Sequence, residues 1–169
     1  MKLLLLSVIV FFSLFANAQS QYEVVKDGDS KILKGILTQE LISKDTSFHW
    51  YAQNKAGYVP QTDAVAALKS KGEQLQILAF GGTWCGDTKN IFPKFFSILD
   101  AASFPATHVT VIGVDRNKKT IGHLAEALNV VNVPTFIILK DGKELGRVVE
   151  YGKTGQWDKE LSDIINAAK

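Results

Sequence analysis

The chemistry in this sequence centres on one thiol. The 169-residue chain has a single cysteine, Cys85, within the segment GGTWCGDTKN at residues 81–90. A Trp-Cys-Gly sequence at the start of a helix usually leads to a second cysteine three residues later, and Thr88 occupies that position. A thiolate can attack a disulfide and form a mixed disulfide. Because the chain has no second thiol, release of the partner requires the substrate's own other thiol or a small thiol in solution.

The residues around the cysteine indicate a moderately activated thiol. We expect Cys85 to lie at the N-terminus of a helix, where the helix dipole and free N–H groups stabilise a thiolate. Thr88, one turn on, is placed to donate its hydroxyl to the sulfur, whereas the carboxylate of Asp87 disfavours a second negative charge nearby. The alternative is a small buried hydrophobic residue, as many free cysteines are. Glycines on both sides of Cys85 favour an exposed loop-to-helix junction, and therefore a functional thiol.

The composition argues against other kinds of site. One cysteine cannot hold a thiolate metal cluster, and the histidines (His49, His108 and His123) show no ligand spacing, so we predict no metal and no cofactor. The net charge is +2 with no run of five like charges, which gives no sign of a nucleic-acid partner. The segment GVDRNKK at residues 113–119 is either a basic rim for a substrate or a solvated turn, and we predict the turn.

The first residues have the pattern of a targeting segment. Lys2 precedes an apolar run of 13 residues, Leu3 to Phe15, and then Ala-Asn-Ala at residues 16–18. This pattern predicts a cleavable signal peptide over residues 1–18. An uncleaved anchor is the alternative, but a membrane span needs about 20 apolar residues. No cysteine follows the run to carry a lipid, so we expect a periplasmic or secreted protein with no stable membrane insertion after cleavage.

Apolar spacing predicts alternating helices and strands in the later part of the chain. Strands are expected at residues 75–80, 108–114, 134–139 and 144–151, and helices at 62–72, from Cys85 to Leu99, at 120–128 and at 154–165. We expect N-caps at Thr62 or Asp63, Thr120 and Thr154, and a hairpin turn at residues 140–143. Alternation of this kind implies a parallel sheet core with an antiparallel edge.

The earlier residues are less regular. Residues 30–45 are expected to form a short strand or helix, and residues 47–58 a helix capped by Ser47. We therefore divide the chain into a signal peptide (1–18), an N-terminal extension packing on the domain (19–61) and one α/β domain (62–169).

Four landmarks in this order make the chain resemble the thioredoxin family. They are Trp84-Cys85-Gly86 after a strand, Pro93 inside the following helix, Val133-Pro134-Thr135 before a strand, and Gly152 after the last strand. The resemblance implies a three-layer α/β/α sandwich with a central mixed sheet, here with an N-terminal extension. It also implies that Pro134 is cis and faces Cys85, so that the backbone of Val133 and Thr135 can bind an extended substrate. A simple turn proline is the alternative.

The resemblance implies thiol–disulfide chemistry, and the departures from the family restrict it. Thr88 replaces the second cysteine, Ala79 stands where the family has a buried acid, and Val111 lies near the place of its lysine partner. We therefore expect a single-cysteine oxidoreductase or isomerase. Cys85 and Thr88 would be its catalytic residues, and its substrate-binding residues would be Trp84, Gly86, Asp87, Val133, Pro134 and Thr135. Its partners would be proteins with disulfides or thiols. A low-molecular-weight thiol is a further candidate partner, which would regenerate the Cys85 thiol.

The sequence is also consistent with two other hypotheses about the site. One is a redox-inactive binding module that uses the groove beside Pro134. The other is a redox-inert structural domain.

Overall fold

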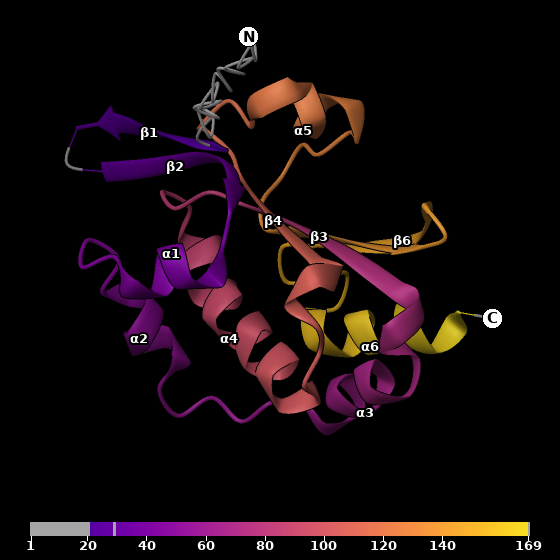
Figure 1. Cartoon of the computed structure of the whole chain (residues 1–169). Coiled ribbons are helices and arrows are strands. Elements are labelled where there is room, and N and C mark those ends of the chain that lie inside the picture. Colours follow the sequence, from indigo (N-terminus) through magenta and orange to yellow (C-terminus); the bar gives the residue numbers. More distant parts are fainter. Residues whose placement is uncertain (1–20, 29, 169) are drawn as a thin grey trace, which may run out of the picture.

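One six-stranded sheet organises the protein. The computed structural model describes residues 21–28 and 30–168, so the signal peptide predicted at residues 1–18 lies outside the described residues. The sheet has the order β1-β2-β4-β3-β5-β6 (Figure 1). Its strands are β1 (Tyr22–Asp27), β2 (Ser30–Leu37), β3 (Leu75–Gly81), β4 (Val109–Gly113), β5 (Thr135–Lys140) and β6 (Lys143–Val149).

The sheet is mixed, with less parallel pairing than the sequence suggested. Among the described residues only β3 and β4 pair in parallel, while β5 runs antiparallel to β3. The hairpin predicted at residues 140–143 is confirmed, since β5 and β6 pair antiparallel around Asp141 and Gly142, both with positive φ. The parallel direction expected for β5 was wrong, because alternation along the chain does not fix the direction in which a strand enters the sheet. The central mixed sheet that the resemblance implied is confirmed.

Alternation along the central strands divides the core between two faces. Ile77 and Ala79 of β3 face a large cluster, while Phe80 of the same strand belongs to a smaller cluster. In β5, Phe136 likewise faces the large cluster and Ile137 the small one. Side chains of successive strand residues point to opposite faces, so both faces must be covered.

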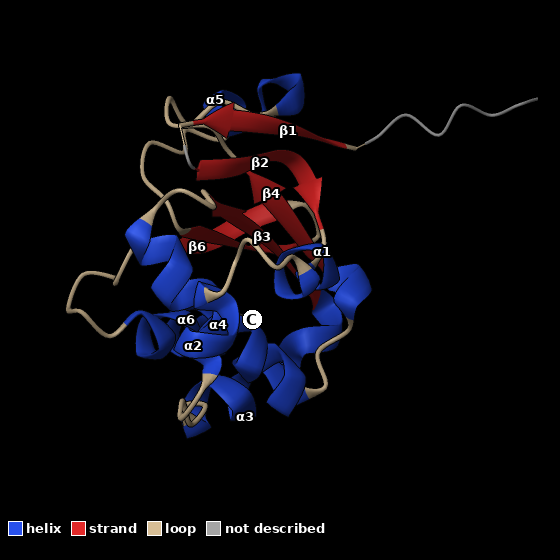
Figure 2. Ribbon diagram, turned by 90° about the vertical axis from the view of Figure 1, so that its left-hand side faces the viewer, coloured by secondary structure: helices blue, strands red, loops and turns tan. Residues whose placement is uncertain are grey.

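Among the described residues, five helices cover one face of the sheet and one short helix covers the other. Figures 1 and 2 show this arrangement. The first group consists of α1 (Gln39–Lys44), α2 (Trp50–Lys55), α3 (Thr62–Lys71), α4 (Gly86–Ala102) and α6 (Trp157–Ala167). The helix on the opposite face is α5 (Leu124–Ala127). This is the predicted α/β/α sandwich, with one outer layer much thinner than the other.

The longest described helix, α4, contributes three phenylalanines to the aromatic core. Phe92, Phe95 and Phe96 are almost fully buried, and the Phe95 ring lies 4.3 Å from that of Phe136 between ring centroids. Pro93 lies inside the helix, as predicted, and the hydroxyl of Ser97 donates to its carbonyl oxygen at 2.9 Å. Because proline has no N–H, the carbonyl that loses its helical donor is that of Lys89, four residues earlier, and the side-chain amide of Asn54 donates to it at 3.1 Å.

The predicted caps were mostly wrong. The N-cap of α3 is Gln61, whose side-chain oxygen accepts from the backbone N–H of Ala64 at 2.6 Å. The N-cap of α6 is Gln156 rather than Thr154. Ser47 does not cap α2, because its N–H donates to the carboxylate of Asp45 in a turn before the helix begins. Local side-chain turns of this kind compete with capping.

The amphipathic helix predicted over residues 120–128 is reduced to one turn of α5 and a preceding 3₁₀ turn (Ile121–His123). Gly122 and His123 both have positive φ, and this interrupts the helix. Thr120 does not act as a side-chain cap either, because its hydroxyl donates to the carbonyl oxygen of Gly113 at 2.7 Å. The apolar spacing therefore indicated the buried face but not the conformation.

The N-terminal segment is part of the sheet. β1 and β2 form an antiparallel hairpin, and β2 pairs with the edge of β4 at Gly35 and Gly113. A Cβ atom on Gly113 would lie 2.2 Å from the carbonyl oxygen of Leu33. The close approach of the β2 backbone therefore depends on glycine at this position.

We expect Gly113→Ala to lower the free energy of unfolding by about 1–3 kcal/mol, because the new methyl group must displace β2 from β4. Gly86→Ala is the matched control, since its Cβ would meet no atom within 4 Å. Urea unfolding followed by circular dichroism measures both. Equal midpoints for the two variants would contradict the assigned packing.

Candidate active site

Cys85 lies where β3 passes into α4. It is the N-cap residue of α4, with an extended backbone (φ −81°, ψ 130°), and its side chain makes no capping hydrogen bond. Its N–H donates to the carbonyl oxygen of Gly82 at 2.8 Å, and its own carbonyl accepts from Lys89 N–H at 3.0 Å. The side chain is partly exposed. The thiol therefore stands at the positive end of a 17-residue helix, within reach of solvent.

The sulfur faces the segment before β5. Cys85 Sγ donates to the carbonyl oxygen of Val133 at 3.2 Å, and the Val133–Pro134 peptide bond is cis, as the resemblance implied. Two stretches that are 48 residues apart in the sequence thus meet at one atom pair. The same carbonyl becomes available to another donor when the thiol loses its proton, because a thiolate is an acceptor only.

The segment after Val133 is held inside the sheet. Pro134 is buried, and its carbonyl oxygen accepts from Glu150 N–H at 2.7 Å. Thr135 is 2% exposed, pairs with residues of both β3 and β6, and donates its hydroxyl to the carbonyl of Asn132. Of the three residues predicted here, Val133 is therefore the one that borders the thiol directly.

Thr88 is buried rather than available to the sulfur. It is 1% exposed, and its hydroxyl oxygen accepts from the N–H of Gly82 at 3.2 Å. Among the described residues its hydroxyl makes no hydrogen bond with Cys85, so the structure does not provide the predicted contact. The bond to Gly82 instead closes the turn that precedes the cysteine.

Trp84 covers the other side of the turn. Its indole N–H donates to the carbonyl of Val114 at the end of β4, at 3.0 Å. Gly82 permits this placement, because a Cβ there would lie 2.6 Å from the indole ring. Trp84 and Cys85 both pack against the smaller core cluster, so the site lies on the thinly covered face of the sheet.

Thr83 ties this turn to the N-terminal hairpin. Its hydroxyl donates to the carbonyl of Lys31 at 2.9 Å and accepts from the N–H of Leu33 at 3.2 Å, both in β2. The side chain is 5% exposed. A buried hydroxyl that both donates and accepts a hydrogen bond fixes the backbone two residues before the cysteine. Sequence reasoning missed Thr83, since nothing in the pattern indicated that β2 passes beside it.

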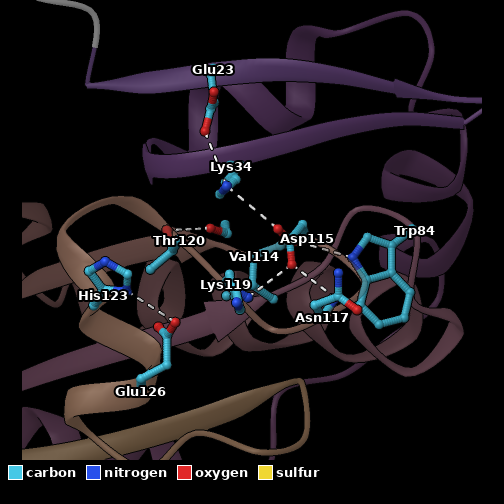
Figure 3. Close-up of polar contacts among 11 residues, drawn as sticks. Glu23, Lys34, Trp84, Val114, Asp115, Asn117, Lys119, Thr120, His123 and Glu126 are labelled. Atoms are coloured by element: carbon cyan, nitrogen blue, oxygen red, sulfur yellow. Dashed lines mark hydrogen bonds and ion pairs between the residues drawn. The ribbon is translucent and has the colours of Figure 1, made fainter.

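The loop after β4 is built around Asp115. One oxygen of its carboxylate accepts from the N–H groups of Asn117 and Lys119, each at 2.9 Å (Figure 3). Lys34 of β2 stands between this carboxylate, at 3.5 Å, and Glu23 of β1, at 3.3 Å. Burial disfavours the charge on Lys34, but the two carboxylates outweigh burial and raise its pKa.

This loop places two cations beside Trp84. The guanidinium carbon of Arg116 lies 5.3 Å from the centre of the indole ring, and Lys118 Nζ lies 5.8 Å from it. Cations within about 6 Å of an indole face are attracted by its quadrupole. The predicted solvated turn is therefore also a part of the rim next to the site. The cluster of basic residues was visible in the sequence, but not its contact with Trp84.

The structure thus brings together Trp84, Cys85, Gly86, Asp87 and Val133, while Thr88, Pro134 and Thr135 support them from inside. No group of three metal-ligating side chains gathers in residues 21–28 or 30–168. The arrangement holds one partly exposed sulfur at a helix N-terminus against a backbone carbonyl.

Comparison with known proteins agrees with this geometry. The model of the family "Thioredoxin" matches residues 61–166. Thioredoxin of Mycobacterium tuberculosis is 33% identical over 114 residues, which cover 66% of this chain and 92% of that protein. Thioredoxin of Chlamydia pneumoniae is 37% identical over 95 residues, which cover 54% of this chain and 80% of that protein.

One solved structure has a similar fold at low sequence identity. It is a protein of unknown function from Pseudomonas aeruginosa, with 16% identity and a TM-score of 0.52, covering 76% of this chain and 90% of that one.

We expect Thr83→Val to cost about 1–3 kcal/mol of stability, because Lys31 and Leu33 would lose a buried hydrogen-bond partner. Thr83→Ser keeps the hydroxyl and is the control. The variants are compared by urea unfolding and by the rate at which iodoacetamide alkylates Cys85. If the Val variant matches the Ser variant in both measurements, the Thr83 hydroxyl does not anchor the turn.

Proposed function

The protein belongs to the thioredoxin family of thiol–disulfide oxidoreductases, and on this basis we propose that it is an exported single-cysteine member in which Cys85 is the nucleophile. One observation carries the proposal. The partly exposed Sγ of Cys85 lies at the N-terminus of α4 and 3.2 Å from the carbonyl of Val133, next to the cis bond to Pro134.

Attack on a disulfide begins with loss of the thiol proton to solvent. The free N–H groups and the dipole at the start of α4 stabilise the resulting thiolate. The Val133 carbonyl then has no donor from the protein's thiol, and it accepts an N–H from the backbone of an extended substrate. The thiolate attacks one sulfur of the substrate disulfide, forms a mixed disulfide and expels the other sulfur as a thiolate.

Release of the substrate needs a thiol from elsewhere. Thr88 occupies the place of a second cysteine and cannot attack the mixed disulfide. Return of the substrate's own thiolate, with a changed pairing, gives isomerisation. Attack by a small thiol on the Cys85 sulfur releases the reduced substrate and leaves a mixed disulfide between Cys85 and the small thiol. A second small thiol then attacks that bond, which gives the disulfide of the small thiol and returns Cys85 as a thiol.

Export is part of the proposal and rests on the N-terminal sequence. The charged, apolar and small-residue regions of residues 1–18 support cleavage before Gln19 and a periplasmic or secreted location. None of the helices in the described part of the chain is long and apolar enough to cross a bilayer. In an oxidising compartment, substrate disulfides persist long enough to be attacked.

We expect the mature protein from its native host to begin at Gln19, which N-terminal sequencing measures directly. A mature chain that still begins at Met1 and stays with the membrane fraction would contradict export by cleavage.

A binding module is the second candidate, and two exposed residues favour it. Val131, three residues before Pro134, is 72% exposed. Tyr151 is 38% exposed and follows Glu150, whose N–H donates to the carbonyl of Pro134. Exposed apolar side chains beside this segment can contact a bound peptide without any covalent step. Under this alternative, Cys85→Ala would retain partners captured from the native compartment.

We expect Thr88→Cys to allow release of the substrate from the mixed disulfide with Cys85. When wild-type protein reacts with a small aromatic disulfide, one leaving thiol should appear per protein and a mixed disulfide should persist. In the variant, the new thiol one turn from Cys85 attacks that bond, so a second leaving thiol should appear and an internal disulfide should form. Absorbance and intact mass measure both products.

Thr88→Ser is the matched control and should behave as wild type, while Cys85→Ser should release no leaving thiol. Two equivalents of leaving thiol from the wild type would contradict the single-cysteine mechanism.

A further inference from the structure

The rim of the candidate site is electrostatically uneven. On the side of Trp84, Arg116 and Lys118 both lie within 6 Å of the indole centre. Trp84 is the residue before Cys85, and both pack against the smaller core cluster, so these cations lie next to the candidate site. Asp87, two residues after Cys85, is partly exposed in the first turn of α4.

The cations are held in place by the loop itself. Asp115 accepts hydrogen bonds from the N–H groups of Asn117 and Lys119, and the N–H of Lys118 donates to the carbonyl of Asp115 at 2.9 Å. Figure 3 shows this carboxylate turned toward Lys34 and the backbone of its own loop. The loop is therefore a preorganised turn, and its charged side chains start from a fixed backbone.

The named charges around this loop balance, with Glu23, Asp27 and Asp115 against Lys34, Arg116 and Lys118, but their ion pairs do not include Lys118. The charge of Asp115 is balanced by Lys34, which also meets Glu23. Arg116 forms an ion pair with Asp27 at the tip of the β1–β2 hairpin. Lys118 makes no ion pair with any residue in the described ranges, so its charge remains available beside Trp84.

We propose that this rim selects disulfides that carry a carboxylate close to the attacked sulfur, with Lys118 and Arg116 as its specificity-determining residues. The proposal rests on the function proposed for Cys85. A carboxylate next to the disulfide meets Lys118, while the apolar part of the substrate covers the indole of Trp84. Charged rims of this kind act mainly on the rate of encounter, and salt weakens them.

The chemical step is the same exchange for every substrate. The Cys85 thiolate forms a new S–S bond as the substrate's S–S bond breaks, and the second sulfur leaves as a thiolate, so no external oxidant or reductant is needed. Selection therefore concerns which disulfide reaches the sulfur, and it should depend on the charge of the disulfide and not on its reducibility alone.

The test compares two aromatic disulfides in the full mature chain. 5,5′-Dithiobis(2-nitrobenzoate) carries two carboxylates and 4,4′-dithiodipyridine is neutral near pH 7, and both release chromophores that stopped flow records. The quantity measured is the ratio of the two second-order rate constants. We expect Lys118→Gln to lower the ratio of anionic to neutral rate about 3-fold, and Arg116→Gln with Lys118→Gln about 3–10-fold, at low ionic strength.

Lys118→Gln alone isolates the effect of Lys118, because Arg116→Gln in the double variant also frees the carboxylate of Asp27. The control carries Lys69→Gln and Lys143→Gln, which remove two exposed charges, one from α3 and one from the start of β6. It should keep the wild-type ratio. In the wild type, added salt should lower the ratio toward that of the double variant.

Three results would overturn the proposal. A ratio that stays unchanged in the Lys118 and Arg116 variants would exclude the selective rim while leaving the function of Cys85 intact. An equal fall in the control would assign the effect to net charge alone. A Cys85 that reacts with neither disulfide would overturn both this inference and the proposed function.

Discussion

The contact between Cys85 Sγ and the Val133 carbonyl, at 3.2 Å, is the constraint on which the rest of the site depends. It requires the end of β3, the start of α4 and the segment before β5 to meet at one point. Gly82 allows the turn to close over Trp84, and the buried Thr88 hydroxyl fixes that turn from inside. The pairing of β3 with β5 then brings the Val133 carbonyl to the sulfur. The fold thus supplies the two features that the chemistry needs, a helix N-terminus behind the sulfur and a backbone acceptor in front of it.

The N-terminal hairpin is the second support of the site. Through Thr83 it holds the turn before Cys85, and through Lys34 it holds the loop after β4. A third contact joins α2 to the same region, where the side-chain amide of Asn54 donates to the carbonyl of Lys89 in the first turns of α4 at 3.1 Å. The hairpin thus supports two parts of the site, and α2 contacts the beginning of α4. Changes in the hairpin should therefore alter the reactivity of the thiol as well as the stability of the sheet.

Much of the fold could be predicted from local pattern, because strand and helix periodicities are local properties. The strands of the later domain, the 140–143 hairpin and the helix with Pro93 were all found in this way. Features that depend on distant partners were not. Glutamine caps at Gln61 and Gln156 have no strong sequence signal, and the left-handed conformation of His123 could not be foreseen. For the site, Cys85 and the cis bond at Pro134 followed from motif and resemblance. Thr83 and the two cations over Trp84 depend on chain segments that meet only in the folded protein.

The central claim is that the fold makes Cys85 a better nucleophile than its local sequence alone would. The most direct measurement is the second-order rate of alkylation of Cys85 by iodoacetamide at neutral pH, compared with the rate for a free peptide of residues 81–90. If a helix N-terminus stabilises the thiolate, the folded protein should react several times faster than the peptide. A rate equal to or below that of the peptide would show that the Val133 contact shields an inert thiol, and the account of the site would be wrong.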